Sequence, residues 1–143
     1  MDTKLELTAG DFSNAGHASS RIKQILKQLN IPPEIIKRVV VALYEAEVNV
    51  VAHSYGGYVA CSISSEGISI RVADEGPGIP DLDLAMTEGY STASQEVREM
   101  GFGAGMGLPN IRNNVDSLSI NTRKDAPTEI DMFISFSQGK ENA

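Results

Sequence analysis

The apolar positions along this chain follow two different periods, and each period predicts a type of element. Leu5 and Leu7 alternate with polar residues, which indicates a short strand over 3–8. Apolar side chains then recur at helical spacing over 12–29, and a longer run over 33–53 is apolar nearly all round. The first run predicts an amphipathic helix, and the second predicts a central helix that is buried on most sides.

Residues that typically begin helices stand near the start of both runs. Ser19 or Ser20 is expected to cap the first helix, and Asn14 is an alternative cap. Pro33 suits the first turn of the second helix, where its missing N–H costs nothing. Two helices separated by a short turn are therefore expected.

The second half of the chain returns to strand-like alternation. The expected strands are 58–64, 68–73, 118–122 and 129–137. A short helical patch is expected near 82–86, and a helix over 108–115. The polar, glycine-rich stretch over 87–107 has few apolar anchors, which is typical of a functional lid or a disordered segment.

The order of these elements predicts the fold class. It lacks the regular alternation of strand and helix that builds a doubly wound sheet. We therefore expect an α/β (α+β) two-layer sandwich, in which helices pack on one face of a mixed β-sheet. At 143 residues, the chain fits a single domain over 1–137, followed by a flexible tail over 138–143.

Composition excludes several classes of function. The formal net charge is −7 with no block of Lys or Arg, which disfavours binding to nucleic acid or to an anionic membrane. No apolar run approaches the roughly 18 residues of a membrane span, and no basic segment followed by an apolar core opens the chain. Cys61 is the single cysteine, so an intrachain disulfide and a cysteine-rich zinc site are excluded, and a buried thiol is expected. The expected location is the cytoplasm.

The long helix carries a polar stripe. Glu45 and Asn49 stand four residues apart and share a face, which Arg38 and His53 extend in both directions. The amide oxygen of Asn49 suits Mg²⁺, which takes one or two protein ligands together with phosphates. The carboxylate of Glu45 suits a proton acceptor. Taken alone, the stripe is more typical of a solvent-facing surface.

Two glycine-containing segments follow. Asp74 stands where an apolar strand stops and can accept a hydrogen bond from the exocyclic amine of adenine, while Gly76 and Gly78 allow a tight turn beside the base. This pattern is also typical of an ordinary turn. Further on, glycines precede a helix whose N-terminus would attract phosphate, although a flexible loop explains them as well. These glycines are Gly101, Gly103, Gly105 and Gly107.

In this order, the three segments resemble the Bergerat-fold (GHKL) ATPases, the group that includes gyrase and histidine kinases. The similarity is closer to bacterial anti-sigma factors and switch-protein serine kinases. Their N-box helix resembles YEAEVNVVAHSYGG, and their first glycine box and lid resemble VADEGPGIPDLDLAMTEGYSTAS. Their second glycine box resembles GAGMGLPNIRNNVDSLSINT, and their closing strand resembles PTEIDMFI. The resemblance covers about residues 36 to 134.

The resemblance implies a role for each matching residue in binding ATP or ADP with Mg²⁺. Glu45 would be the general base, Asn49 the magnesium ligand and Asp74 the reader of adenine. Thr128 would hold a water molecule between Asp74 and the base, and Gly76 and Gly78 would shape the base pocket. The residues implied to contact phosphates are Gly103, Gly105, Met106, Gly107 and Leu108.

Two positions depart from the family pattern. Glu47 stands where relatives have an apolar or small residue, which indicates either a shifted helix or a contact with a partner. Some relatives carry an arginine just before the second glycine box, whereas this chain has Gly103 and Ala104 there. Arg98 is the nearby basic candidate. If nothing replaces that charge, phosphoryl transfer would be slow or absent while nucleotide binding persists.

The resemblance implies three possible functions. The first is a serine/threonine kinase that transfers the γ-phosphate of ATP to a STAS-domain partner, and Glu45 suits the proton transfer that such a reaction needs. The second is a non-catalytic anti-sigma module that sequesters a sigma factor in the presence of ATP. The third is a detached histidine-kinase catalytic domain, which is disfavoured because no phosphoacceptor hairpin is evident. The apolar residues over 22–29 suit either the core or a homodimer contact.

Overall fold

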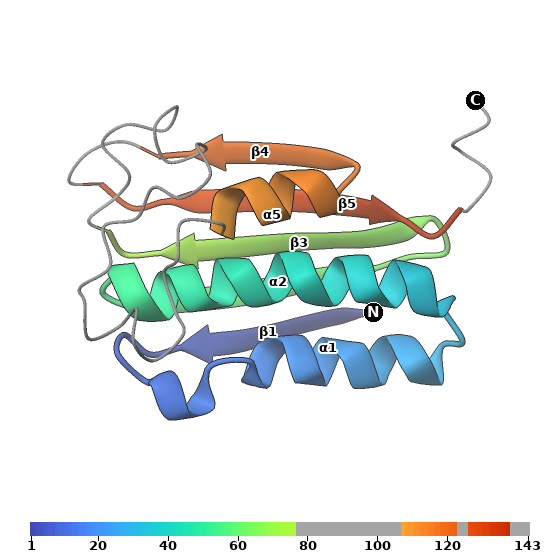
Figure 1. Cartoon of the computed structure of the whole chain (residues 1–143), viewed down its shortest axis with the longest axis horizontal. Coiled ribbons are helices and arrows are strands. Elements are labelled where there is room, and N and C mark those ends of the chain that lie inside the picture. Colours follow the sequence, from blue (N-terminus) through green and yellow to red (C-terminus); the bar gives the residue numbers. More distant parts are fainter. Residues whose placement is uncertain (77–106, 123–125, 138–143) are drawn as a thin grey trace.

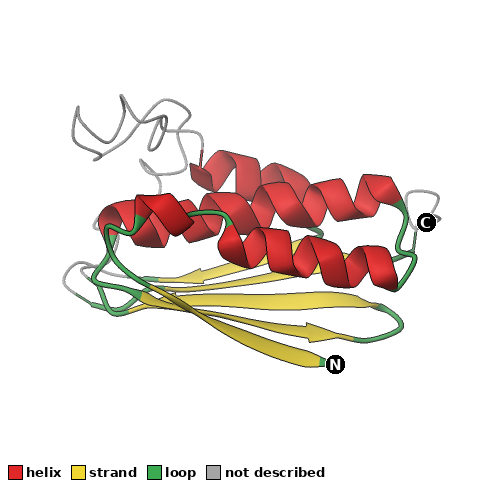
Figure 2. Cartoon of the chain, turned by 90° about the horizontal axis from the view of Figure 1, so that it is seen from below, coloured by secondary structure: helices red, strands yellow, loops and turns green. Residues whose placement is uncertain are grey.

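The computed structural model describes residues 1–76, 107–122 and 126–137, which form a two-layer sandwich. The α-helices of these residues lie together on one face of a five-stranded sheet, and no described helix covers the other face (Figure 2). The expected fold class is therefore confirmed. Within the described parts of the chain, no helix combines the length and the hydrophobicity that crossing a bilayer requires.

The elements follow the apolar spacing closely. The strands are β1 (Asp2–Leu7), β2 (Gly57–Ile63), β3 (Gly67–Asp74), β4 (Ser117–Asn121) and β5 (Glu129–Ser135). The helices are α1 (His17–Gln28), α2 (Pro33–His53) and α5 (Gly107–Asn114), with a short 3-10 helix η1 (Phe12–Asn14) before α1. The expected single helix over 12–29 is thus divided into η1 and α1. The patch expected near 82–86, the stretch over 87–106 and the tail over 138–143 lie outside the described residues.

The sheet has the strand order β1-β2-β3-β5-β4, and each of these pairings is antiparallel. The expected two-layer architecture is present, but the expectation of a mixed sheet was wrong, because all pairings between the described strands are antiparallel. Helices α1 and α2 run in opposite directions, so together they return the chain to the end of the sheet where β1 stops (Figure 1). Strand β2 must then run antiparallel to β1, because a parallel pair needs a crossover that returns the chain to the other end.

The core lies between the sheet and the helices. Helix α1 contributes Ile22, Ile25 and Leu26, so the apolar stripe over 22–29 packs inside the chain except for Leu29, which is 45% exposed. Cys61 is buried in the same core, as expected, and burial raises the pKa of its thiol to about 12. The sheet contributes side chains from alternate positions, among them Val59, Ile70, Val72, Met132 and Ile134.

Helix α1 begins without the side-chain cap that its sequence predicts. The residue before its first turn is Gly16, whose φ of 96° is left-handed, and no side chain of the helix caps it. The Ser19 hydroxyl instead donates to the carbonyl of Gly16, and Asn14 bonds to Asp11. A Cβ on Gly16 would lie 3.2 Å from Cε1 of Tyr44, so glycine also permits a close approach to α2.

The cap comes from α2, in the form of the Glu47 carboxylate. Its Oε2 accepts hydrogen bonds from the N–H groups of Gly16 at 3.0 Å and Ala18 at 3.1 Å, and its Oε1 accepts one from Ser19 at 3.2 Å. Glu47 is 1% exposed. The unusual acid in the N-box segment therefore marks a contact between two helices of this chain, and α2 keeps the extent that was expected. The first N–H groups of a helix lack internal partners and attract negative charge, which explains the burial of this acid.

Candidate functional site

The residues implied to bind nucleotide come from elements that meet at one end of the fold. Helix α2 ends, β3 ends and α5 begins at the left of the view in Figure 1. Asn49 stands about one turn before the end of α2, and Glu45 stands about two turns before it. The backbone joins the neighbouring loops, because Tyr55 N–H donates to Gly76 O at 2.9 Å and Glu75 N–H donates to Gly56 O at 3.0 Å.

Asp74 closes β3 and is half-buried. Its Oδ1 accepts hydrogen bonds from the N–H groups of Gly76 at 2.8 Å and Thr128 at 3.0 Å. The left-handed φ of 111° at Gly76 lets the chain turn back in this way. Burial raises the pKa of Asp74, and the two hydrogen bonds oppose that shift. Among the described residues no hydrogen bond reaches Oδ2, so this oxygen can accept one from a ligand.

Thr128 stands beside Asp74, as the resemblance implies. The two residues also pair through Asp74 N–H and Thr128 O at 2.9 Å. The Thr128 side chain is buried, and its hydroxyl lies 2.6 Å from the hydroxyl of Thr122. Thr128 therefore fixes the position of the Asp74 carboxylate directly, through its backbone.

Glu45 and Asn49 share one face of α2, and both are half-buried. Oε2 of Glu45 accepts a hydrogen bond from Nδ2 of Asn110 on α5 at 3.2 Å, and Oε1 has no hydrogen bond within the described chain. Asn49 makes no hydrogen bond to any described residue. Burial, together with the charges of Glu45 and Glu47, raises the pKa of the neighbouring Tyr44.

Helix α5 is fastened to α2 at a second point. Nε of Arg38 donates to the carbonyl of Asn114 at 3.0 Å, and Nη2 of Arg38 pairs with Asp116 at 3.0 Å. Arg38 therefore neutralises the C-terminal end of α5, and it belongs to the structural contact between the helices. Leu108 is buried in the first turn of α5. Gly78, Arg98, Gly103, Gly105 and Met106 lie outside the described residues.

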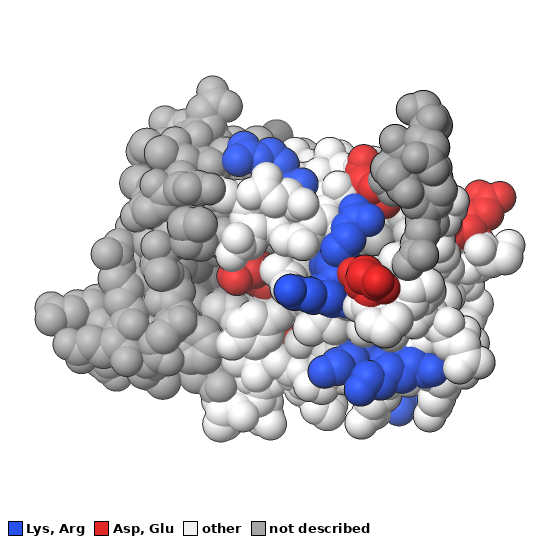
Figure 3. Space-filling model, turned by 45° about the vertical axis from the view of Figure 1, so that its right-hand side comes forward, with Lys and Arg blue, Asp and Glu red and all other residues white. Residues whose placement is uncertain are grey.

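The helical layer differs in charge from the chain as a whole. Helices α1, α2 and α5 carry six Lys or Arg residues and three Glu residues, although the net charge of the chain is −7. Figure 3 shows the basic side chains spread over this layer. The basic residues are Arg21, Lys23, Lys27, Lys37, Arg38 and Arg112. A phosphate or an acidic partner approaching the helices therefore meets less repulsion than the net charge indicates.

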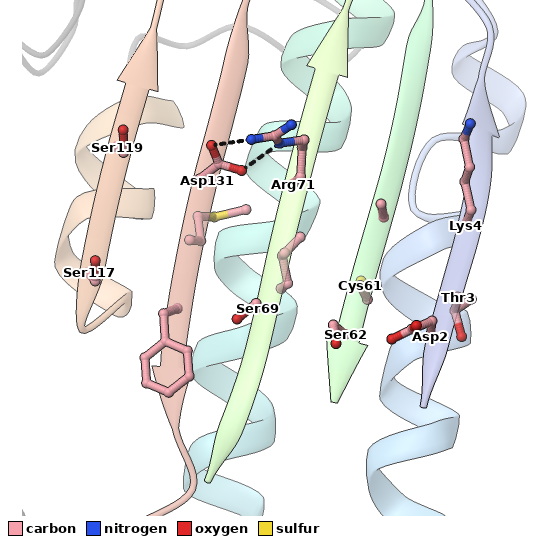
Figure 4. A pocket seen from close by; sticks show the side chains of 14 residues that line it. Asp2, Thr3, Lys4, Cys61, Ser62, Ser69, Arg71, Ser117, Ser119 and Asp131 are labelled. Atoms are coloured by element: carbon pink, nitrogen blue, oxygen red, sulfur yellow. Dashed lines mark hydrogen bonds and ion pairs between the residues drawn. The ribbon is translucent and has the colours of Figure 1, made fainter. Parts of the chain in front are cut away.

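A concavity of about 650 Å³ lies on the sheet face that the described helices leave open (Figure 4). Lys4, Ala60, Arg71, Asp131 and Ser119 form one row across its strands. Arg71 bonds Asp131 through Nε at 2.8 Å and Nη2 at 3.1 Å, and this pairing raises the pKa of Arg71. Because these charges satisfy each other and lie on the other face from Glu45 and Asn49, the concavity is a poorer candidate for a phosphate site.

Two residues of this region escaped prediction from sequence. Asn110 contacts Glu45, and its place two residues after Leu108 gave the only hint that it lies near the site. Glu47 departs from the family pattern, but its contact with α1 depends on a segment about thirty residues earlier in the chain. Nothing in the local spacing predicts either partner.

The donor set suits a magnesium nucleotide better than a metal ion alone. Within the described residues, no three His, Cys, Asp or Glu side chains gather as metal ligands. Asn49 offers one hard oxygen, and Mg²⁺ commonly takes its remaining ligands from phosphates and water. Oδ2 of Asp74 and the amide of Asn49, which have no hydrogen bond to the described residues, are the polar groups that such a ligand would satisfy.

Comparison with known proteins identifies the family. A model of the histidine kinase-like ATPase domain matches residues 9–134. The chain is 28% identical to the serine/threonine-protein kinase RsbT of Bacillus subtilis (strain 168), over 76% of this chain and 78% of that kinase. It is 30% identical to an anti-sigma F factor of Clostridium perfringens (strain 13 / Type A), over 92% of this chain and 96% of that factor.

The fold is also shared with a solved structure. The RsbU and RsbW domains of Rv1364c from Mycobacterium tuberculosis superpose with a TM-score of 0.62 at 17% identity, over 94% of this chain. This chain spans 31% of the length of that one. The family model covers most of the chain, and the relatives align along most of their own lengths. The chain therefore belongs to the histidine kinase-like ATPase domain family, and its homologues include anti-sigma factors and serine kinases.

Proposed function

We propose that this protein binds Mg·ATP and acts as a serine/threonine kinase of the anti-sigma or switch type, with a STAS-domain protein as its phosphate acceptor. The observation that carries the proposal is the free acceptor capacity at one end of the fold. Within the described chain, Asp74 and Glu45 each have one carboxylate oxygen without a hydrogen bond, and the amide of Asn49 is unpaired. Family membership supports ATP as the ligand.

Each of these groups has a distinct task in the proposed complex. Oδ2 of Asp74 would accept a hydrogen bond from the exocyclic amine of adenine, which guanine does not have at that position. The amide oxygen of Asn49 would bind Mg²⁺, which offsets charge on the phosphates. The backbone N–H groups at the start of α5, near Gly107 and Leu108, would face the phosphates.

Glu45 would serve the transfer itself. A serine or threonine oxygen of the partner forms a bond to the γ-phosphorus, and the bond from that phosphorus to the β,γ-bridging oxygen breaks. The electron pair of the broken bond leaves with ADP, and Glu45 takes the hydroxyl proton. The product is a phosphorylated partner whose added charge changes its docking.

Transfer of labelled phosphate tests this function. The protein is incubated with Mg²⁺, γ-labelled ATP and candidate STAS-domain proteins from the same organism. Glu45→Gln is expected to slow transfer by about 10²–10⁴-fold while ADP affinity changes less than about twofold. Glu34→Gln, an exposed acid on the same helix, is the matched control. Absence of transfer by the wild type, or an undiminished rate in Glu45→Gln, would refute the proposal.

A second candidate is a binding module that sequesters a sigma factor only when ATP is present. The similarity to anti-sigma F factors favours this second candidate, because those relatives align with nearly all of this chain. It predicts stoichiometric capture of a sigma factor that depends on ATP and occurs without ADP formation. Capture together with turnover would instead indicate that both activities belong to this protein.

A further inference from the structure

The contact between Asn110 and Glu45 has a defined direction. A carboxylate offers only acceptors, so the nitrogen of the Asn110 amide must face Glu45 and its oxygen must face away. The 3.2 Å bond reaches Oε2 alone. Among the described residues no hydrogen bond reaches Oε1 of Glu45, so this is the oxygen that an incoming hydroxyl would meet.

The backbone of Asn110 is itself held in place. Nδ2 of Asn114 donates to the carbonyl of Asn110 at 2.8 Å, and Arg38 on α2 donates to the carbonyl of Asn114 at 3.0 Å. Pro109 and Ile111, the neighbours of Asn110, are fully buried. The Asn110 amide therefore reaches Glu45 from a fixed support, and α2 and α5 are joined both at Glu45 and at Arg38.

We infer that Asn110 is a positioning residue for Glu45. By occupying one carboxylate oxygen, it restricts rotation of the carboxylate and directs Oε1 toward the space where an acceptor hydroxyl would enter. Nothing else in the described chain bonds to this carboxylate, so within those residues Asn110 is the contact that restrains its rotation. The inference rests on the proposed function, because a positioned base matters only if Glu45 accepts a proton. Preorganised geometry of this kind affects the rate of reaction more than the affinity for a substrate.

Substitutions of Asn110 separate positioning from nucleotide binding. Asn110→Ala removes the donor, and Asn110→Asp keeps the shape while placing a second carboxylate beside Glu45. Single-turnover transfer from ATP to the STAS-domain partner is expected to slow by about 10–100-fold in Asn110→Ala, and further in Asn110→Asp. ADP affinity should change less than about twofold in both. Asn113→Ala, an exposed asparagine on the same helix, should transfer at the wild-type rate.

A spectroscopic measurement tests the contact without relying on activity. The side-chain amide protons of Asn110 are followed by nuclear magnetic resonance in the wild type and in Glu45→Ala. The proton held by Glu45 is expected to move upfield when the carboxylate is removed, and to stay in place in Asn113→Ala. Unchanged Asn110 signals in Glu45→Ala would overturn the inference, and this arm remains decisive even if Asn110→Ala does not fold.

The kinetic outcomes distinguish the inference from the function on which it rests. If the wild type transfers phosphate and Asn110→Ala transfers equally fast, the positioning role is refuted and the kinase function stands. If the wild type transfers no phosphate, the kinase function is refuted, and the positioning role is refuted with it. A slower rate that comes with an equal loss of ADP affinity would also refute positioning, because it would indicate general disruption of the site.

Discussion

Replacing Glu47 tests whether a buried acid on α2 holds the start of α1. The carboxylate is 1% exposed and accepts three N–H groups, from Gly16, Ala18 and Ser19. In Glu47→Ala these groups lose their acceptor. Water can still reach Gly16, which is half-buried, but the hydrogen bonds of Ala18 and Ser19 lie in buried surroundings. The variant should therefore leave two buried N–H groups unsatisfied at a helix terminus.

The cost follows from those two groups. A buried donor without a partner costs about 1–3 kcal/mol, and loss of the favourable charge at a helix N-terminus adds about 0.3–2 kcal/mol. The variant no longer has the desolvation penalty of a buried charge, and this offsets part of the loss. Glu47→Ala is therefore expected to lower the free energy of unfolding by about 3–5 kcal/mol. Glu47→Gln keeps one acceptor oxygen but turns an NH₂ group toward an N–H donor, for a loss of about 1–3 kcal/mol.

Urea denaturation followed by circular dichroism measures these losses, and Glu34→Ala is the matched control because Glu34 is exposed on the same helix. Formate provides a second test, since it can enter the space left in Glu47→Ala and accept the same hydrogen bonds. At 100 mM formate and a Kd of about 10 mM, the variant would regain about 1.4 kcal/mol. Chloride at equal ionic strength should not restore it. A loss no larger than that of Glu34→Ala, or equal effects of the two anions, would refute this account of the α1 terminus.

Three further variants or treatments have definite expected outcomes. Because burial raises the pKa of Asp74, its ionised form weakens folding above that pKa and the penalty disappears as pH falls through it. Asp74→Asn keeps the Oδ1 acceptor, so it should raise the urea midpoint at pH 8, match the wild type at acid pH and lose ADP binding in calorimetry. With a pKa of about 12 and little exposure, Cys61 should react with iodoacetamide at pH 8 about a thousandfold more slowly in folded than in urea-unfolded protein. Arg38→Ala should lower the free energy of unfolding, measured by urea denaturation, by about 1–2 kcal/mol. Lys37→Ala, at the exposed neighbouring position, should change it little.

Apolar spacing predicts the strands and α-helices of the described chain, although it does not separate η1 from α1. The buried stripe of Ile22, Ile25 and Leu26 repeats at the helical period, and buried strand residues recur mostly at every second position, as Val59, Cys61 and Ile63 do, so both patterns are visible in short windows. The direction of the strands was not predictable in the same way. It depends on α1 and α2 forming an antiparallel pair that returns the chain to the end of the sheet where β1 stops, and this pairing is a property of their packing.

The candidate site was predictable only in part for a similar reason. Asp74 was expected at the end of a strand because an apolar run stops there, and the structure places it there. Its pairing with Thr128 required knowledge that β5 lies beside β3. The contact between Asn110 and Glu45 was unpredictable for the same reason, because α5 follows Glu45 by about sixty residues and only tertiary packing brings the two side chains together.

Glu45 and Glu47 show how the surroundings of a carboxylate indicate its role. Both interrupt the apolar pattern of the same helix, and that pattern by itself does not distinguish their tasks. Glu47 accepts hydrogen bonds from three backbone N–H groups and is buried, so both of its oxygens are used in holding the start of α1. Within the described residues Glu45 has one side-chain donor and is half-buried, so one of its oxygens has no hydrogen bond there. A buried acid needs several partners to be stable, whereas a catalytic base must keep an oxygen available, and only Glu45 meets the second condition.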